Sequence, residues 1–225
     1  MKKQELNRLY KFSDAKMIVV GNEKIAFIRR DQIEFNKFGI TTADVDQLEA
    51  LINAFENLET DGEALADQSS AAIEKDKKAD SLKEAIRTLM ARVNLQFSDK
   101  SAKYRMFGTD ALAHQTDSEL HITAKRVVRV ANIFLADLTP KGLTPDMLTE
   151  IIALNNDFAT LIIDLKVTTG LRDIKREDRV KAGNVIYAVL SSYAKTVQSI
   201  WSTKDTAKCN DYVIYDTVSG EIEAA

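Results

Sequence analysis

The densest apolar pattern in this chain lies between Leu143 and Val167. Its large apolar residues recur at alternating steps of four and three, the spacing that puts side chains on one face of an α-helix. A second apolar row lies beside the first, and a helix that is apolar over most of its girth is a buried helix. Residues 143–167 therefore predict the central helix of a bundle. The two rows are Met147, Ile151, Leu154, Phe158, Leu161 and Leu165, and Leu148, Ile152, Ala159 and Ile162.

Capping residues place further helices around this one. Ser13 stands at an expected N-cap, as does either Thr41 or Thr42. Thr116 and Glu119 have the spacing of a capping box, and Pro145 suits a first helical position. The expected helices cover residues 13–37, 42–58, 61–107, 116–138, 143–167 and 172–203. The predicted fold is all-α, an elongated antiparallel bundle of five or six helices.

The same pattern predicts what surrounds the central helix. Thr168, Thr169 and Gly170 are expected to end it and to separate it from the helix at 172–203. The two other strongly patterned segments, 120–138 and 186–201, are its expected neighbours. Gly183 is expected to mark the close approach of a neighbouring helix, with the central helix as the candidate, because glycine inside a helix costs about 1 kcal/mol relative to alanine.

Residues 13–37 fit two structures. Two β-branched runs, at 17–20 and 25–28, flank Gly21 and Asn22 and could form a β-hairpin. Ser13 at one end and Gly39 at the other suit the caps of a helix. Because both ends agree, the pattern favours the helix.

The C-terminal tail, residues 204–225, differs from the rest and is expected to be extended. Its β-prone run cannot be stable as an isolated strand. It must pack on the bundle, pair with the N-terminal segment or pair with another chain, so its four residues are candidate interaction residues. They are Tyr212, Val213, Ile214 and Tyr215.

No repeat, low-complexity linker or domain boundary interrupts the sequence. Residues 1–225 therefore predict a single helical domain, with possible sub-layers at 13–107 and 117–203 and the tail at 204–225.

Composition excludes several classes of protein. The net charge is −3, from 31 basic and 34 acidic residues, so no excess of charge indicates a nucleic acid or an anionic membrane as partner. The first apolar run, at 17–20, is far shorter than the roughly 20 residues of a membrane helix. Cys209 is the only cysteine, which excludes an intrachain disulfide. The expected location is the cytoplasm, or a virion if the gene belongs to a phage.

The two histidines suggest one metal site. Asp110, His114, Asp117 and His121 follow one another at steps of four, three and four, which would place them on one face of a continuous helix. Histidine and carboxylate side chains can bind a divalent transition metal. The capping box at Thr116 divides this segment, however, so the sequence favours ordinary surface histidines and implies no metal or other cofactor.

Other polar groups have a structural and a functional interpretation each. The basic cluster of helix 116–138 and the charged stretch 172–181 suit a solvated helix face, with a partner-binding ridge as the alternative. Polar residues within the central helix suit a buried network, with a ligand site as the alternative. Cys209 has no histidine near it in sequence, and no known catalytic or phosphate-binding motif occurs. The basic cluster is Lys125, Arg126 and Arg129, and the polar residues are Asn155, Asn156, Asp157 and Asp164.

Three short segments resemble a group of uncharacterised all-helical proteins encoded in Bacteroidetes genomes, whose genes are chromosomal or carried by phages or other mobile elements. The resemblance runs from about Ser13 to the tail, and Cys209 departs from it by replacing an expected aromatic residue. It implies an all-helical fold and no established activity. The segments are Phe107-Gly108, Gly142-Leu143-Thr144 and Asn210-Asp211-Tyr212-Val213-Ile214-Tyr215-Asp216.

The sequence therefore favours a non-enzymatic structural or protein-interaction bundle, such as a component of a phage particle, which binds a protein partner or copies of itself. No catalytic residue is predicted. The alternative is a bundle enzyme, or a protein that binds a metal or small ligand through Asp110–His121.

Overall fold

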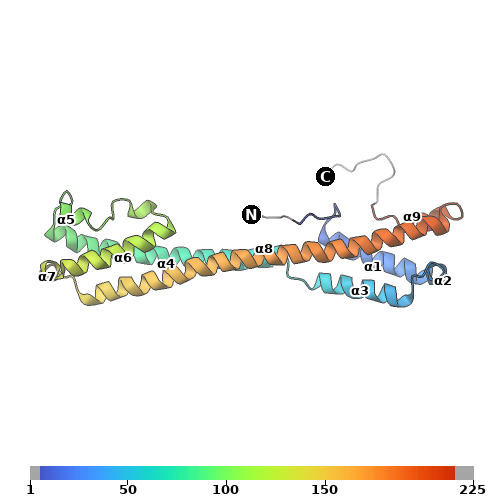
Figure 1. Cartoon of the computed structure of the whole chain (residues 1–225), viewed down its shortest axis with the longest axis horizontal. Coiled ribbons are helices and arrows are strands. Elements are labelled where there is room, and N and C mark those ends of the chain that lie inside the picture. The colour runs from blue at the N-terminus through green and yellow to red at the C-terminus, as the bar shows by residue number, and fades with distance from the viewer. Residues whose placement is uncertain (1–5, 216–225) are drawn as a thin grey trace. The chain divides into compact units, whose positions relative to one another are not determined.

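A computed structural model describes residues 6–215 of the chain, so residues 216–225 of the expected tail lie outside the described residues. The described residues form helices and no strand, which confirms the all-α fold class (Figure 1). Four of the α-helices have only four or five residues. The elements are α1 (Asp14–Arg30), α2 (Gln32–Asn36), α3 (Thr42–Glu56), α4 (Asp61–Gln96), α5 (Ala102–Arg105), the 3₁₀-helix η1 (Leu112–His114), α6 (Asp117–Ile133), α7 (Leu135–Leu138), the 3₁₀-helix η2 (Thr139–Lys141), α8 (Pro145–Trp201) and α9 (Thr206–Asn210).

The predicted N-caps are confirmed. The Ser13 hydroxyl accepts a hydrogen bond from the N–H of Lys16 at the start of α1. Complete capping boxes begin α3, where Thr41 pairs with Asp44, and α6, where Thr116 pairs with Glu119. Each box satisfies N–H groups that have no partner inside the helix.

Residues 14–30 form the helix α1, as favoured over a hairpin. Gly21, which suggested the turn of a hairpin, is instead required by packing, since a Cβ there would lie only 2.5 Å from Cδ1 of Ile52 on α3. The glycine thus allows α1 and α3 to pack closely. The expected end at residue 37 is wrong, because α1 stops at Arg30 and the chain turns at Asp31 into α2.

The predicted break at Thr168, Thr169 and Gly170 is also wrong, because α8 runs through it without interruption for 57 residues (Figure 1). The Thr168 and Thr169 hydroxyls donate to the carbonyl oxygens of Asp164 and Leu165, at 2.9 and 2.8 Å, and so are satisfied within the helix. Glycine keeps its N–H, so it weakens a helix without breaking it.

The described residues gather into two compact units. Unit 1 comprises the described residues up to Asp61 and those from Asp173 onward, and unit 2 comprises residues 62–172. Each of the expected sub-layers, 13–107 and 117–203, contains residues of both units. Helix α8 contributes its first part to unit 2 and its second part to unit 1.

Unit 2 has a core made by α4, α6 and the start of α8. The predicted packing of the central helix against 120–138 is therefore confirmed. The other predicted neighbour, 186–201, is wrong, because those residues continue the same helix. The fully buried side chains of this core include Leu82, Ile86, Leu89, Leu120, Val127 and Phe158.

Unit 1 has its own core, between α1, α2, α3 and the end of α8. Gly183 of α8 does mark a close approach, but to Tyr10 and not to the central helix, since a Cβ there would lie 2.8 Å from Tyr10 Cε1. The fully buried side chains of this core include Met17, Ile28, Phe35, Leu48, Ile52, Phe55 and Ile186.

The continuity of α8 can be tested at Gly170. Replacing this residue by proline removes a helical N–H and adds a steric clash, so Gly170→Pro should lower the free energy of unfolding by about 3 kcal/mol or more. The control Gly170→Ala keeps the N–H and meets open space, so its stability should equal or exceed that of the wild type. Denaturant unfolding followed by circular dichroism measures both. Equal stability of the proline variant and the wild type would indicate a loop at this position.

Candidate functional site

Asp31, at the junction of α1 and α2, is a buried charged residue with several hydrogen-bond donors around it. Its N–H donates to the carbonyl oxygens of Phe27 and Ile28 and so ends α1. This turn directs the carboxylate into unit 1, where only 4% of the side chain is exposed. A buried carboxylate is costly unless it is paired and hydrogen-bonded.

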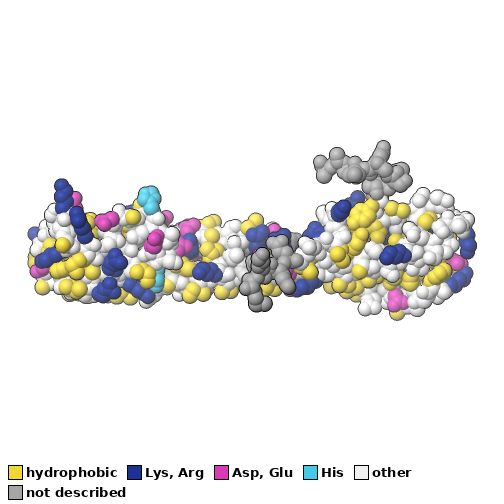
Figure 2. All heavy atoms as spheres, turned by 45° about the horizontal axis from the view of Figure 1, so that its top comes forward, with side chains coloured by type: hydrophobic (Ala, Val, Ile, Leu, Met, Phe, Trp, Pro, Cys, Tyr) yellow, Lys and Arg dark blue, Asp and Glu magenta, His cyan; other side chains and the backbone are white. Residues whose placement is uncertain are grey.

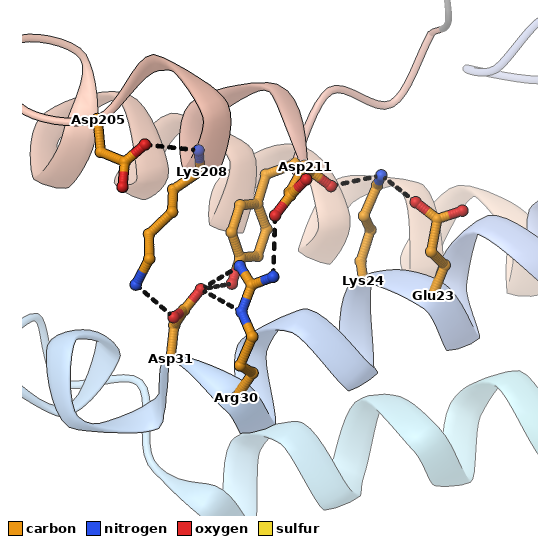
Figure 3. Close-up of polar contacts among 8 residues, drawn as sticks. Glu23, Lys24, Arg30, Asp31, Asp205, Lys208 and Asp211 are labelled. Carbon is orange, nitrogen blue, oxygen red and sulfur yellow. Dashed lines mark hydrogen bonds and ion pairs between the residues drawn. The ribbon is translucent and has the colours of Figure 1, made fainter.

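Three side chains satisfy the Asp31 carboxylate (Figure 3). Arg30 donates to Oδ2 from Nη2 at 2.6 Å and from Nε at 3.2 Å. Lys208 Nζ lies 2.8 Å from Oδ1, and the Tyr212 hydroxyl donates to Oδ2 at 3.0 Å. Two of these donors lie about 180 positions away in the sequence, so the carboxylate ties the C-terminal segment to the α1–α2 junction.

Further contacts hold the same segment. Arg30 Nη1 forms an ion pair with Asp211 Oδ2 at 2.9 Å. The buried Lys24 donates from Nζ to the carbonyl oxygen of Asp211 at 2.7 Å. Asp205 caps α9 by accepting from the N–H of Lys208. We refer to Lys24, Arg30, Asp31, Lys208, Asp211 and Tyr212 as the Asp31 cluster.

Aromatic side chains shield the Asp31 cluster. The Tyr212 ring stacks on Trp201, with centroids 5.7 Å apart and an interplanar angle of 10°. Phe35 packs edge-on against Trp201, and Phe27 packs edge-on against Tyr212. Apolar rings around a hydrogen bond exclude water and strengthen it. Burial and the hydrogen bond to Asp31 together raise the pKa of Tyr212, so its hydroxyl remains a donor.

Opposing effects act on Asp31. Burial by itself would raise the pKa of the carboxyl group, but the hydrogen bonds from Arg30, Lys208 and Tyr212 outweigh it and lower the pKa below 3.8. Both carboxylate oxygens are also occupied. The group is thus an ionised acceptor near neutral pH, suited to holding structure together and unsuited to transferring protons there.

A second carboxylate, Asp14, anchors the N-terminal segment. Arg179 of α8 donates from Nε to Asp14 Oδ2 at 2.6 Å and from Nη1 to the carbonyl oxygen of Leu58 at 2.8 Å. The Tyr10 hydroxyl donates to Asp14 Oδ1 at 2.8 Å. Burial, together with this bond, raises the pKa of Tyr10 to about 12.

The structure does not assemble the four metal candidates. Asp110 and His114 are exposed. Asp117 forms an ion pair with Lys75 at 2.6 Å, and Nδ1 of His121 lies 3.0 Å from Oδ1 of Asn155. Over residues 6–215, no group of three or more histidine, cysteine or acidic side chains could hold a metal ion.

The remaining polar candidates separate into surface and packed groups. In the stretch 172–181, Lys175 binds Glu59 and Arg179 binds Asp14, so part of the expected ridge is engaged within unit 1. Of the polar residues in the central helix only Asn155 is buried, with His121 as its partner. The others are exposed, as are Lys125, Arg126 and Arg129.

The tail begins differently from expectation, because residues 206–210 form the helix α9 where an extended chain was predicted. Of the four candidate interaction residues, Tyr212 is buried, Ile214 packs against the unit 1 core and Val213 is 44% exposed. The Tyr215 hydroxyl donates to that of Tyr187 at 3.3 Å. The chain's own bundle therefore provides a docking surface for this part of the tail.

Sequence reasoning missed Asp31, Lys24 and Lys208. A signal for two of them was present. Lys24 and Asp31 lie seven residues apart on the inner face of the segment, between the apolar positions Val20 and Phe35. Charged residues on an apolar face indicate a buried partner. Lys208 lies in the tail, outside any apolar helical face predicted from the sequence, so it gives no such signal.

The fold and this site define an all-helical protein in which a buried polar centre joins distant segments of its own chain. No protein-family model, curated protein or solved structure matches the chain. None of the helices in the described part of the chain is long and apolar enough to cross a membrane.

The bond between Tyr212 and Asp31 can be measured with a double-mutant cycle. Tyr212→Phe keeps the stacked ring but removes a hydrogen bond to a charged group, so the free energy of unfolding should fall by about 1.5–3 kcal/mol. In an Asp31→Asn background the same substitution should cost less. Equal losses in both backgrounds, measured by urea unfolding, would show that the two side chains are not coupled.

The lowered pKa of Asp31 predicts how stability depends on pH. Because the folded state holds the carboxylate more strongly ionised than the unfolded state does, Asp31 stabilises the fold above about pH 4 and this contribution is lost as the pH falls further. Urea unfolding between pH 7 and pH 3 should show a smaller loss for Asp31→Asn than for the wild type. The matched control is Asp46→Asn, at an exposed ion pair, and its loss should follow that of the wild type.

Proposed function

We propose that this protein is a non-enzymatic structural or interaction protein, a helical scaffold that binds copies of itself or a protein partner within a larger assembly such as a phage particle. Its long helices would pack antiparallel within each unit. The Asp31 cluster would then fix the C-terminal segment, and exposed helix surfaces would make the contacts with other chains.

One observation carries this proposal. Within α8, no residue between Phe158 and Val180 is buried, although the apolar pattern of the predicted central helix continues to Val167. The burial expected around the second half of the central helix is therefore not found in the single chain. Apolar surface of this kind is typical of a contact with another molecule. The exposed large residues in the stretch are Ile163, Val167, Leu171 and Ile174.

Apolar side chains also reach the surface elsewhere. Figure 2 shows them among charged residues on the face drawn. Exposed large apolar residues on other helices include Ile33 of α2, Leu95 of α4, and Ile122 and Ile133 of α6. Single exposed apolar residues are ordinary, so the row on α8 supports the proposal more strongly than these do.

The alternative of a metal-binding or ligand-binding bundle has no support from the described residues. Asp117 and His121 each face a partner within unit 2, Lys75 and Asn155. Such pairing is what structural side chains show.

The proposal is tested by the mass of the full-length protein in solution. Light scattering over a wide range of concentration should show a species at least twice the chain mass of 25.1 kDa, or a stoichiometric protein partner should remain bound through purification. A chain that stays monomeric and partner-free would contradict the proposal. So would stoichiometric bound metal that is lost in both His114→Ala and His121→Ala.

A further inference from the structure

Five residues form the outer face of α6 in unit 2. Ile122, Arg126, Arg129 and Ile133 follow one another at steps of four, three and four, which places them on one side of the helix, and Lys125 lies beside them. All five side chains are exposed, because the core of unit 2 takes the opposite face of the helix. We refer to these five residues as the α6 surface.

The two ends of the α6 surface are apolar and open. Ile122 is 56% exposed and Ile133 is 64% exposed. The interval of 11 residues between them corresponds to three helical turns, so the two side chains lie about 16 Å apart on the same face. A single exposed isoleucine is ordinary. Two isoleucines that bracket a charged centre on one helix face offer a partner apolar contacts on both sides of that centre.

The centre of the α6 surface consists of cations that the chain leaves unpaired. Over residues 6–215, the side chains of Lys125, Arg126 and Arg129 form neither an ion pair nor a hydrogen bond. Elsewhere in unit 2 such pairs do form, as between Lys75 and Asp117. The three cations are therefore available to carboxylates of another molecule.

The arrangement of these cations works against the isolated helix. Lys125 and Arg129 are four residues apart, and Arg126 and Arg129 are three residues apart, so like charges are neighbours on the helix surface and repel each other. The last turn of α6, where the helix dipole favours cations, contains none. Carboxylates of a partner would relieve the repulsion, so the α6 surface favours an acidic molecule.

Arg126 is supported by the chain that precedes α6. Gly108, in the turn after α5, has a φ of +68°, and a Cβ there would lie 3.1 Å from Cδ of Arg126. The arginine side chain therefore packs beside this turn and loses less conformational freedom when a carboxylate binds. A guanidinium group can then bind the carboxylate through two parallel hydrogen bonds.

Charge also restricts what can cover the α6 surface. Two copies packed face to face through this surface would bring their cations together, and like charges in contact oppose association. Acidic residues lie beyond both ends of the surface, Glu119 before it and Asp137 after it. A flat anionic membrane would meet these carboxylates, whereas a partner one helix wide can lie between them.

We propose that the α6 surface binds an acidic amphipathic helix of a partner protein, whose carboxylates pair with the three cations and whose apolar residues cover the two isoleucines. Docking of a helix through a stripe of apolar anchors is a recurrent mode of protein recognition. This inference rests on the proposed function, of which it states the chemistry of the partner.

The probe is a synthetic alanine-based helical peptide of about 20 residues. It has two leucines at the spacing of Ile122 and Ile133, with glutamates between them on the same face. Fluorescence anisotropy of the labelled peptide should show saturable binding to the full chain that weakens as salt is added, because salt screens charges. A peptide with lysines in place of the glutamates should not bind. Equal binding of both peptides, or no binding of the glutamate peptide at about 1 mM protein, would overturn the proposal.

Charge reversal tests the cations. Arg126→Glu and Arg129→Glu should each weaken binding of the glutamate peptide by roughly tenfold or more. The matched control is Lys166→Glu, the same change of charge at an exposed position of α8, and it should bind the peptide as the wild type does. Arg129→Glu also removes the repulsion from Lys125. Its thermal unfolding temperature should therefore equal or exceed that of the wild type, which would show that the variant folds.

Truncation tests the apolar ends. Ile133→Ala should weaken binding of the glutamate peptide by roughly threefold or more, because less apolar surface is covered. The matched control is Ile163→Ala on α8, where the side chain is 61% exposed, and its binding should be unchanged. Equal effects of the two substitutions would contradict a specific role of Ile133.

The outcomes separate this inference from the proposed function. Unchanged peptide binding in Arg126→Glu and Arg129→Glu would overturn the α6 surface as the site. A chain that cosediments with vesicles of phosphatidylserine and phosphatidylcholine, loses this in the same variants and does not bind the peptide would show a lipid surface in place of a protein partner. Either result leaves the mass measured by light scattering, and with it the proposed function, unaffected.

Discussion

The unbroken ladder of backbone hydrogen bonds in α8 is the feature on which both hydrophobic cores depend. Its early residues, such as Phe158, complete the core of unit 2, and its late residues, such as Ile186, complete that of unit 1. Between them lies the stretch without a buried residue. Most helix stability in proteins comes from packing, so this stretch has the least support within the chain, and a covering partner would stabilise it most.

Local chemistry made much of this fold predictable. Ser13, the Thr41–Asp44 pair and the Thr116–Glu119 pair act within four residues of themselves, so the starts of α1, α3 and α6 could be placed from sequence. The continuity of α8 could not be predicted from the sequence. Two threonines and a glycine suit a turn as well as a helix, and the deciding hydroxyl bonds form only once the helix exists.

The Asp31 cluster shows a different limit. Lys24 and Asp31 were recognisable as charges on an apolar face. Asp31 meets Lys208 and Tyr212, and Lys24 meets the carbonyl oxygen of Asp211, only because the chain returns after about 180 residues. The β-prone run Tyr212-Val213-Ile214-Tyr215 in the tail suggested a strand that would need a pairing partner. The aromatic ring of Tyr212 instead finds Trp201, and its hydroxyl finds a buried carboxylate. The polar atom, more than the apolar pattern, decides where this residue lies.

Unit 2 is continuous in sequence, whereas unit 1 is divided into two segments that enclose it. This nesting has a consequence for synthesis on the ribosome. Residues 62–172 can complete their core as soon as they have emerged, but α1 and α3 must wait for the end of α8 and for α9. Domains generally fold as units during synthesis. The N-terminal helices therefore lack the part of their core that α8 supplies during the translation of more than a hundred residues, and the nascent chain needs protection there longest.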